Sequence, residues 1–63
     1  MNNKAVKIIK NFGKYNLPVH VFYDNTQAVY KAYIYYGKRL TTCISCGKTI
    51  SDIEKDIERK NRQ

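Results

Sequence analysis

Residues 28–45 have the sequence AVYKAYIYYGKRLTTCIS, and this stretch decides the fold. Its first half, residues 28–36, contains no Gly or Pro and is rich in β-branched and aromatic residues, which favour strands. Gly37-Lys38 can form a two-residue hairpin turn with glycine at the first central position. Residues 39–45 then return as the next strand. The stretch therefore predicts a tyrosine-rich antiparallel hairpin.

The turn also predicts the register of this hairpin, in which Tyr36 pairs with Arg39, Tyr35 with Leu40, and Tyr33 with Thr42. Because side chains alternate along a strand, the hairpin has two faces. One face carries Val29, Lys31, Tyr33, Tyr35, Leu40, Thr42 and Ile44, and the other carries Tyr30, Ala32, Ile34, Tyr36, Arg39, Thr41 and Cys43. Both faces are substantially apolar, so we expect helices to cover one and the other to display tyrosines. The alternative is one helix on each face.

The flanking segments predict one more strand and two helices. Residues 19–23 (VHVFY) suit a strand. Residues 3–12 place four apolar side chains within one arc of a 3.6-residue period, before a glycine that can cap a helix. An isoleucine stripe predicts a helix over residues 50–61 that opens at Thr49 or at Ser51, where Ser51-x-x-Glu54 fits a capping box. We therefore expect one α+β domain over residues 1–63, with the order helix–β–β–β–helix and a three-stranded antiparallel sheet (helix 3–12, strands 19–23, 28–36 and 39–45, helix 50–61).

This order of elements resembles the double-stranded-RNA-binding domain. That family contacts RNA partly through lysines at the start of its second helix, where this sequence has Ser51-Asp52-Ile53-Glu54 with Lys48 nearby. Residues 30–60 also resemble the arm-binding domain of phage integrases, in which a three-stranded sheet enters a DNA groove. Both resemblances rest on the order of elements, and both imply a nucleic-acid ligand.

Charge is unevenly distributed along the 63 residues. Twelve Lys and Arg stand against five Asp and Glu, a net charge of +7. Residues 1–48 hold eight cations and one acid (8 − 1 = +7), whereas residues 49–63 hold four of each. Such asymmetry indicates a polyanionic partner, although a solvated basic surface is the alternative. The candidate contacts are Lys4, Lys7, Lys10, Lys14, Lys31, Lys38, Arg39 and Lys48.

The remaining motifs favour neither catalysis nor a cofactor. His20 is the one histidine and has no acid or nucleophile near it in sequence, so we expect packing rather than an enzyme. Cys43 and Cys46 form a C-x-x-C pair, half of a zinc site, and we assign no metal because a second pair is missing. A site shared across a dimer is the alternative. With no apolar span and no export signal in the sequence, we expect a cytoplasmic protein with reduced thiols.

We therefore expect a non-enzymatic binding module whose first partner is nucleic acid, bound through the basic first helix and the sheet. The alternative is a small protein-interaction or inhibitor protein that binds an acidic protein surface, acting as a homodimer because so short a chain has a thin core. Its interaction face would contain Tyr30, Tyr33, Tyr35 and Tyr36. The Asn-, Lys-, Ile- and Tyr-rich composition suits a low-GC bacterium or its phage, so a phage-encoded inhibitor of a host or defence factor fits this alternative.

Overall fold

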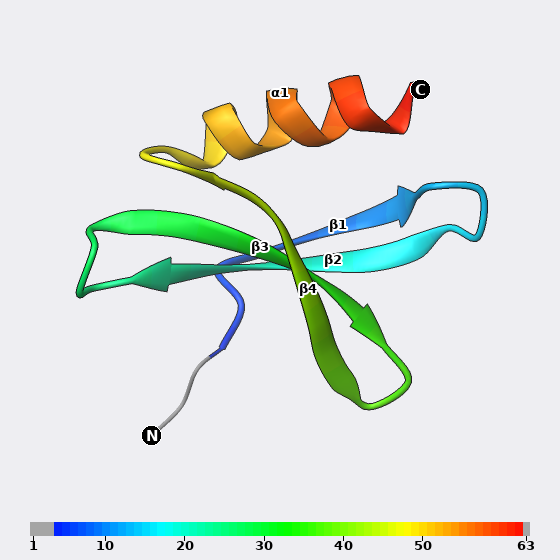
Figure 1. Cartoon of the computed structure of the whole chain (residues 1–63), viewed down its shortest axis with the longest axis horizontal. Coiled ribbons are helices and arrows are strands. Elements are labelled where there is room, and N and C mark those ends of the chain that lie inside the picture. Colours follow the sequence, from blue (N-terminus) through cyan, green and yellow to red (C-terminus); the bar gives the residue numbers. More distant parts are fainter. Residues whose placement is uncertain (1–3, 63) are drawn as a thin grey trace.

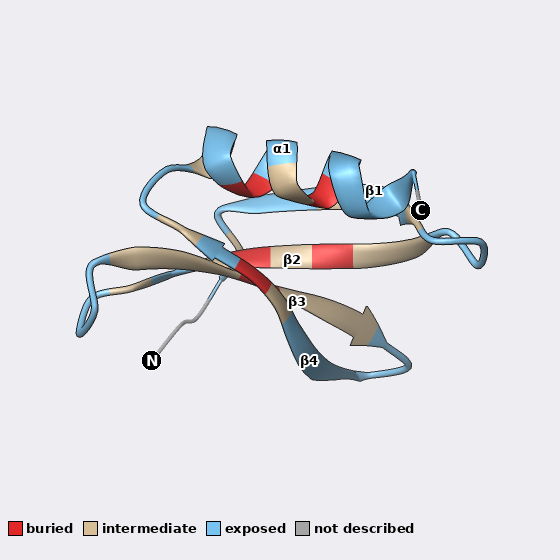
Figure 2. Cartoon of the chain, turned by 45° about the horizontal axis from the view of Figure 1, so that its top comes forward, coloured by how far each residue is buried: buried red, intermediate tan, exposed pale blue. Residues whose placement is uncertain are grey.

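The structure, a computed structural model that describes residues 4–62, has an α+β fold with four antiparallel strands and one C-terminal helix (Figure 1). Each strand pairs with the next, so the order in the sheet is β1-β2-β3-β4. The helix α1 packs on one face of this sheet (Figure 2). The elements are β1 (Lys7–Phe12), β2 (Leu17–Asp24), β3 (Val29–Tyr36), β4 (Arg39–Gly47) and α1 (Ile50–Asn61).

The helix expected over residues 3–12 is wrong: β1 occupies most of this range as an edge strand, and residue 3 lies outside the described residues. A bulge explains the misleading pattern. The register shifts between Ile9 and Phe12, and Asn11 adopts a left-handed φ of 68° there. Both apolar side chains therefore pack toward the core although they are three residues apart, which imitates helical spacing. The chain consequently lacks the first helix that the resemblance to the double-stranded-RNA-binding domain requires.

The β3–β4 hairpin is as expected at its turn and differs beyond it. Tyr36 pairs with Arg39 and Tyr35 with Leu40, and Gly37 has the positive φ (66°) that its turn position requires. The predicted pairing of Tyr33 with Thr42 is wrong, because a bulge shifts the register and places Cys43 opposite Tyr33.

This shift also moves Cys43 to the face that carries Tyr33. A second shift follows between Tyr33 and Ala32, and Ile44, which lies between Cys43 and Ser45, packs toward the core. Ser45, which pairs with Ala32, points to α1, where its hydroxyl donates a 2.7 Å hydrogen bond to Asp56 Oδ2.

A small core lies between α1 and the sheet (Figure 2). The residues buried there are Val19, Val21, Ala32, Ile53 and Ile57. Ile9, Phe12, Tyr30 and Ile44 pack around them and are partly buried. The helix supplies only two of the buried side chains, and it covers only this face. The alternative of one helix on each face is therefore wrong, and the other face is left uncovered by helix, as expected.

Both ends of α1 are fixed by polar contacts. The N-cap is Thr49, whose hydroxyl accepts a hydrogen bond from Asp52 N at 3.1 Å, so of the two expected starts Thr49 is confirmed and the capping box at Ser51 is not used. Near the C-terminus, the Asn61 amide accepts a hydrogen bond from Gly13 N (2.7 Å) and donates one to Asn11 O (3.2 Å). Asn61 therefore holds the last turn of α1 against the β1–β2 turn.

Candidate binding face

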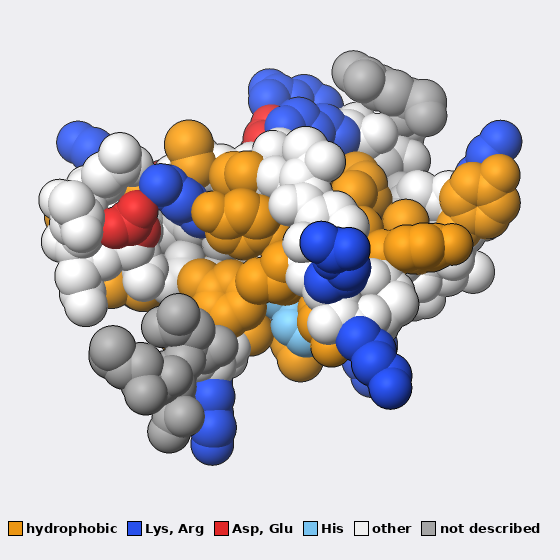
Figure 3. Space-filling model, turned by 60° about the horizontal axis from the view of Figure 1, so that its bottom comes forward, with side chains coloured by type: hydrophobic (Ala, Val, Ile, Leu, Met, Phe, Trp, Pro, Cys, Tyr) orange, Lys and Arg blue, Asp and Glu red, His pale blue; other side chains and the backbone are white. Residues whose placement is uncertain are grey.

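The face of the sheet opposite α1 carries aromatic and aliphatic side chains. Cross-strand pairs place them together: Ile8 lies opposite His20, His20 opposite Tyr33, and Tyr35 opposite Leu40. Figure 3 shows hydrophobic side chains gathered on this side of the molecule, with the histidine among them and Lys and Arg around them. We name this surface the open face and define it by Val6, Ile8, His20, Phe22, Tyr33, Tyr35 and Leu40.

Four rings form a continuous row across β2 and β3 on the open face. His20 stacks on Tyr35, with centroids 4.5 Å apart and planes inclined by 19°. Phe22 lies 6.4 Å from His20 and meets Tyr33 edge-on at 6.2 Å. All four side chains are half-buried, so each ring is held by its neighbours and still reaches solvent.

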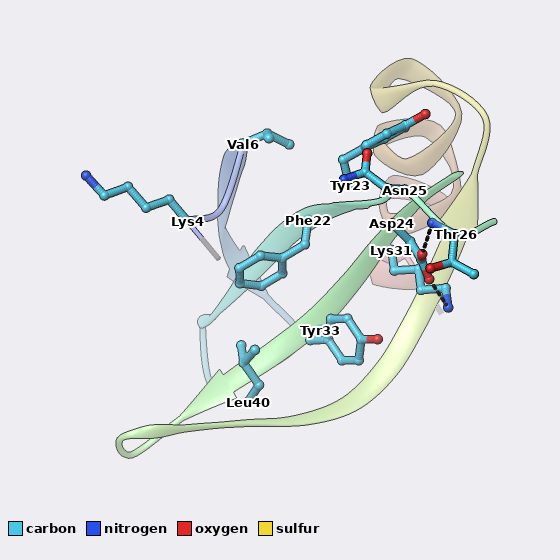
Figure 4. Close-up of a pocket in the computed structure, with 10 residues that line it drawn as sticks. All are labelled: Lys4, Val6, Phe22, Tyr23, Asp24, Asn25, Thr26, Lys31, Tyr33 and Leu40. Carbon is cyan, nitrogen blue, oxygen red and sulfur yellow. Dashed lines mark hydrogen bonds and ion pairs between the residues drawn. The ribbon is translucent and has the colours of Figure 1, made fainter. Parts of the chain in front are cut away.

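One end of this row borders a solvent-open hollow of about 650 Å³ (Figure 4). Phe22, Tyr33 and Leu40 point toward it, and Lys4 extends at one side. At the other side Lys31 Nζ lies 2.8 Å from Asp24 Oδ2. The hollow therefore has an aromatic and aliphatic floor between Lys4 and the Lys31–Asp24 ion pair.

The Lys31–Asp24 pair is tightly hydrogen-bonded. The hydrogen bond from the Lys31 ammonium is the main cause that lowers the pKa of Asp24, and the backbone N–H groups of Gln27 and Thr26 add to it. The same hydrogen bond raises the pKa of Lys31. Both groups are thus charged at neutral pH, and the pair contributes no net charge to the open face.

The eight cations expected to form the contact surface do not lie together. Lys7 Nζ lies 3.1 Å from Glu54 Oε2, on the side of the sheet that α1 covers, and Lys31 is paired as described. Because residues 7–12 are a strand, the expected basic helix face does not exist. The others lie beside the hollow (Lys4), in β1 and the turn after it (Lys10, Lys14), at the β3–β4 turn and the start of β4 (Lys38, Arg39) and before α1 (Lys48).

Acidic side chains are concentrated on the far side of the sheet. Four of the five acids of the chain, Asp52, Glu54, Asp56 and Glu58, belong to α1. Within residues 4–62 the remaining acid is Asp24, which Lys31 neutralises. The separation of charge along the sequence thus becomes a separation across the sheet, and the open face is left without an unpaired carboxylate.

The four tyrosines expected to form one interaction face divide between the two sides of the sheet. Tyr33 and Tyr35 belong to the open face. Tyr30 packs against the core on the α1 side and meets Tyr23 at 4.9 Å. Tyr36 is 66% exposed and points to the side opposite Tyr35.

Sequence reasoning missed His20 and Phe22 as members of the binding face. The alternation of β2 (Leu17–Asp24), with Val19 and Val21 buried, places both on the opposite side, so the signal was present. Their position beside Tyr33 and Tyr35 depends on the β2–β3 register, which the sequence does not specify directly.

The two cysteines lie on β4 with exposed thiols. Cys43 pairs with Tyr33 and Cys46 with Lys31, and these partners lie two residues apart on the open face. Within residues 4–62, no three His, Cys, Asp or Glu side chains are grouped as metal ligands.

No family model, curated protein or solved structure matches this chain. In the described part of the chain, α1 is too short and too polar to cross a membrane.

Proposed function

We propose that the chain is a binding module for single-stranded nucleic acid and that the open face is its binding surface. The observation that carries this proposal is the continuous row of four half-buried rings on an uncovered sheet face. Proteins that bind single strands use such rings as platforms on which successive bases stack, at about 1–3 kcal/mol per base. A duplex keeps its bases stacked inside and offers the rings nothing comparable, so a single strand is the preferred ligand.

The distribution of charge supports an anionic ligand on the same face. The acids of α1 lie behind the sheet, and Lys4 and Lys38 stand at the hollow and at the tip of the β3–β4 hairpin. These two cations can meet phosphates while bases contact the rings. For a single strand, two phosphate contacts correspond to a slope of about −1.4 in a plot of log K against log salt concentration.

Two adjacent tyrosines provide a matched test. Tyr35 belongs to the row of rings, whereas Tyr36 is more exposed and points to the other side of the sheet. Fluorescence anisotropy with a labelled pyrimidine oligonucleotide at about 50 mM salt should show saturable binding. Tyr35→Ala or Phe22→Ala should weaken it about 5- to 150-fold, the equivalent of one stacked base, and Tyr36→Ala should leave it unchanged. Absence of saturable binding at low salt, or equal losses for Tyr35→Ala and Tyr36→Ala, would refute the proposal.

A second candidate function is protein contact through the same face, including contact with a second copy of the chain. The observation that favours it is the exposure of aliphatic side chains on the open face, with Val6 at 52%, Ile8 at 49% and Leu40 at 42%. Such groups add little to base stacking, but they are typical of apolar contact surfaces. Light scattering after size exclusion should then show a dimer that Ile8→Ser and Leu40→Ser dissociate. A monomeric mass at all accessible concentrations would exclude this homodimer.

A further inference from the structure

The bulge between Cys43 and Ser45 in β4 changes the direction in which the thiols of Cys43 and Cys46 point. In a regular strand, residues three positions apart project to opposite faces, so Cys43 and Cys46 would be separated by the sheet. Here the extra residue between them restores the alternation, and Cys43 and Cys46 lie opposite Tyr33 and Lys31, which share one face. Both thiols therefore project from the open face, with Ser45 between them turned to α1.

The local surroundings favour metal binding over an internal disulfide. The cross-strand partners of Cys43 and Cys46 lie two residues apart on β3, which is about 6.6 Å between Cα atoms, and two parallel thiols at a similar spacing are at the upper limit of what a disulfide spans. A zinc ion bonds each sulfur at about 2.3 Å and so holds two sulfurs about 3.8 Å apart, a wider and easier separation. The Cys43 thiol also donates a 3.6 Å hydrogen bond to the backbone oxygen of Ser45, the residue directly before Cys46.

Charge acts in the same direction. A zinc tetrathiolate carries a net charge of −2, which suits a chain with a net charge of +7.

Two cysteines supply only half of the ligands of a structural zinc site. Among residues 4–62 no further ligand is grouped with them, so the other two sulfurs must come from another molecule. β4 is an edge strand, and both thiols are exposed, so a second chain can approach them. A two-fold axis would bring the same pair from the second copy, because an isologous contact uses the same residues of both chains.

We propose that Cys43 and Cys46 bind zinc as half of a four-thiolate site, and that the same two cysteines of a second copy of this chain complete it. Four thiols lose their protons to solvent as one Zn²⁺ binds, so assembly releases four protons and changes no oxidation state. The proposal does not depend on nucleic-acid binding, because it uses the margin of the open face on β4 and none of the four rings.

Cobalt titration of the reduced chain provides the first test, because Co²⁺ replaces Zn²⁺ in thiolate sites and absorbs visible light. We expect sulfur-to-cobalt charge-transfer bands that saturate at one Co²⁺ per two chains and disappear when Zn²⁺ is added. Light scattering should show the mass doubling with Zn²⁺ and returning to that of a monomer with EDTA. Cys43→Ser and Cys46→Ser should each abolish the bands and the Zn²⁺-dependent dimer, whereas Thr42→Ser, a change in the same strand, should leave both intact.

Three outcomes would overturn the proposal. The first is the absence of charge-transfer bands, and the second is saturation at one Co²⁺ per chain without a change in mass. The third is a dimer that survives EDTA. If reductant dissociates that dimer, its basis is an intermolecular disulfide, and if Leu40→Ser dissociates it, its basis is the apolar contact of the second candidate function.

Discussion

The contact between His20 and Tyr35 decides whether the open face is organised before a ligand arrives. These rings come from neighbouring strands and lie 4.5 Å apart with planes inclined by 19°. Aromatic pairs in such geometry contribute about 0.5–1.5 kcal/mol beyond the area they bury. We therefore predict a coupling free energy of about 1 kcal/mol between the two side chains in the folded protein.

A double-mutant cycle measures this coupling. The free energy of unfolding is obtained from urea titrations of the native chain, His20→Ala, Tyr35→Ala and the double variant. Each single substitution should destabilise the fold, and the double variant should lose about 1 kcal/mol less than the sum. In a domain of this size 1 kcal/mol corresponds to a shift of about 4–8 °C in Tm, so thermal unfolding can check the result.

A control cycle combines His20→Ala with Tyr36→Ala, since Tyr36 lies on the opposite side of the sheet. This pair should be additive within about 0.5 kcal/mol. If the His20–Tyr35 cycle were equally additive, the rings would not be held by each other. A base would then not meet a preformed row of rings.

Three further predictions concern the fold that supports this face. Asn61→Ala removes two hydrogen bonds to the β1–β2 turn and should lower the free energy of unfolding by about 1–2 kcal/mol. Asn61→Asp keeps the acceptor for Gly13 N and should lower it by less. Equal losses for both variants in urea titrations would contradict the role of Asn61 in holding α1 against this turn. Ala28 has a left-handed φ of 55°, a conformation that strains any residue with a Cβ atom. Ala28→Gly should therefore raise the free energy of unfolding by about 0.5–1 kcal/mol and raise Tm. A lower Tm would show that this strain is absent. The hydrogen bond from Ser45, together with Lys60, lowers the pKa of Asp56 from 3.8 to about 2, so this stabilisation is present above about pH 4 and is lost as the pH falls toward 2. Asp56→Asn should therefore flatten the fall of Tm between pH 4 and pH 2, and an unchanged profile would exclude the contribution of Asp56.

The sequence predicts the second half of the chain better than the first. The β3–β4 turn and α1 follow from local chemistry: a glycine at the first turn position, and an isoleucine stripe on a chain segment with balanced charge. The segment before Gly13 was misinterpreted because a bulge at Asn11 gives a strand the apolar spacing of a helix. Single-residue bulges leave no clear pattern in sequence, and they also decide the facing of Cys43.

The candidate site was predicted only in part for the same reason. Tyr33 and Tyr35 were assigned to one face correctly, because the turn at Gly37 sets their pairing. His20 and Phe22 join them through the register of β2 and β3, which depends on a four-residue connection with Ala28 in a left-handed conformation. The excess of cations predicts an anionic partner, and this stays a prediction. The positions expected for several of these cations depended on a helix that does not form.

The most direct test of the central claim is to map a bound oligonucleotide onto the sheet. Backbone amide and side-chain NMR spectra of the native chain should be recorded during titration with an unlabelled single strand at low salt. We predict the largest shift changes at His20, Phe22, Tyr33 and Tyr35, with small changes at Ile53 and Ile57 of α1 behind the sheet. Shift changes concentrated on α1, or no changes at a saturating concentration of oligonucleotide, would contradict it.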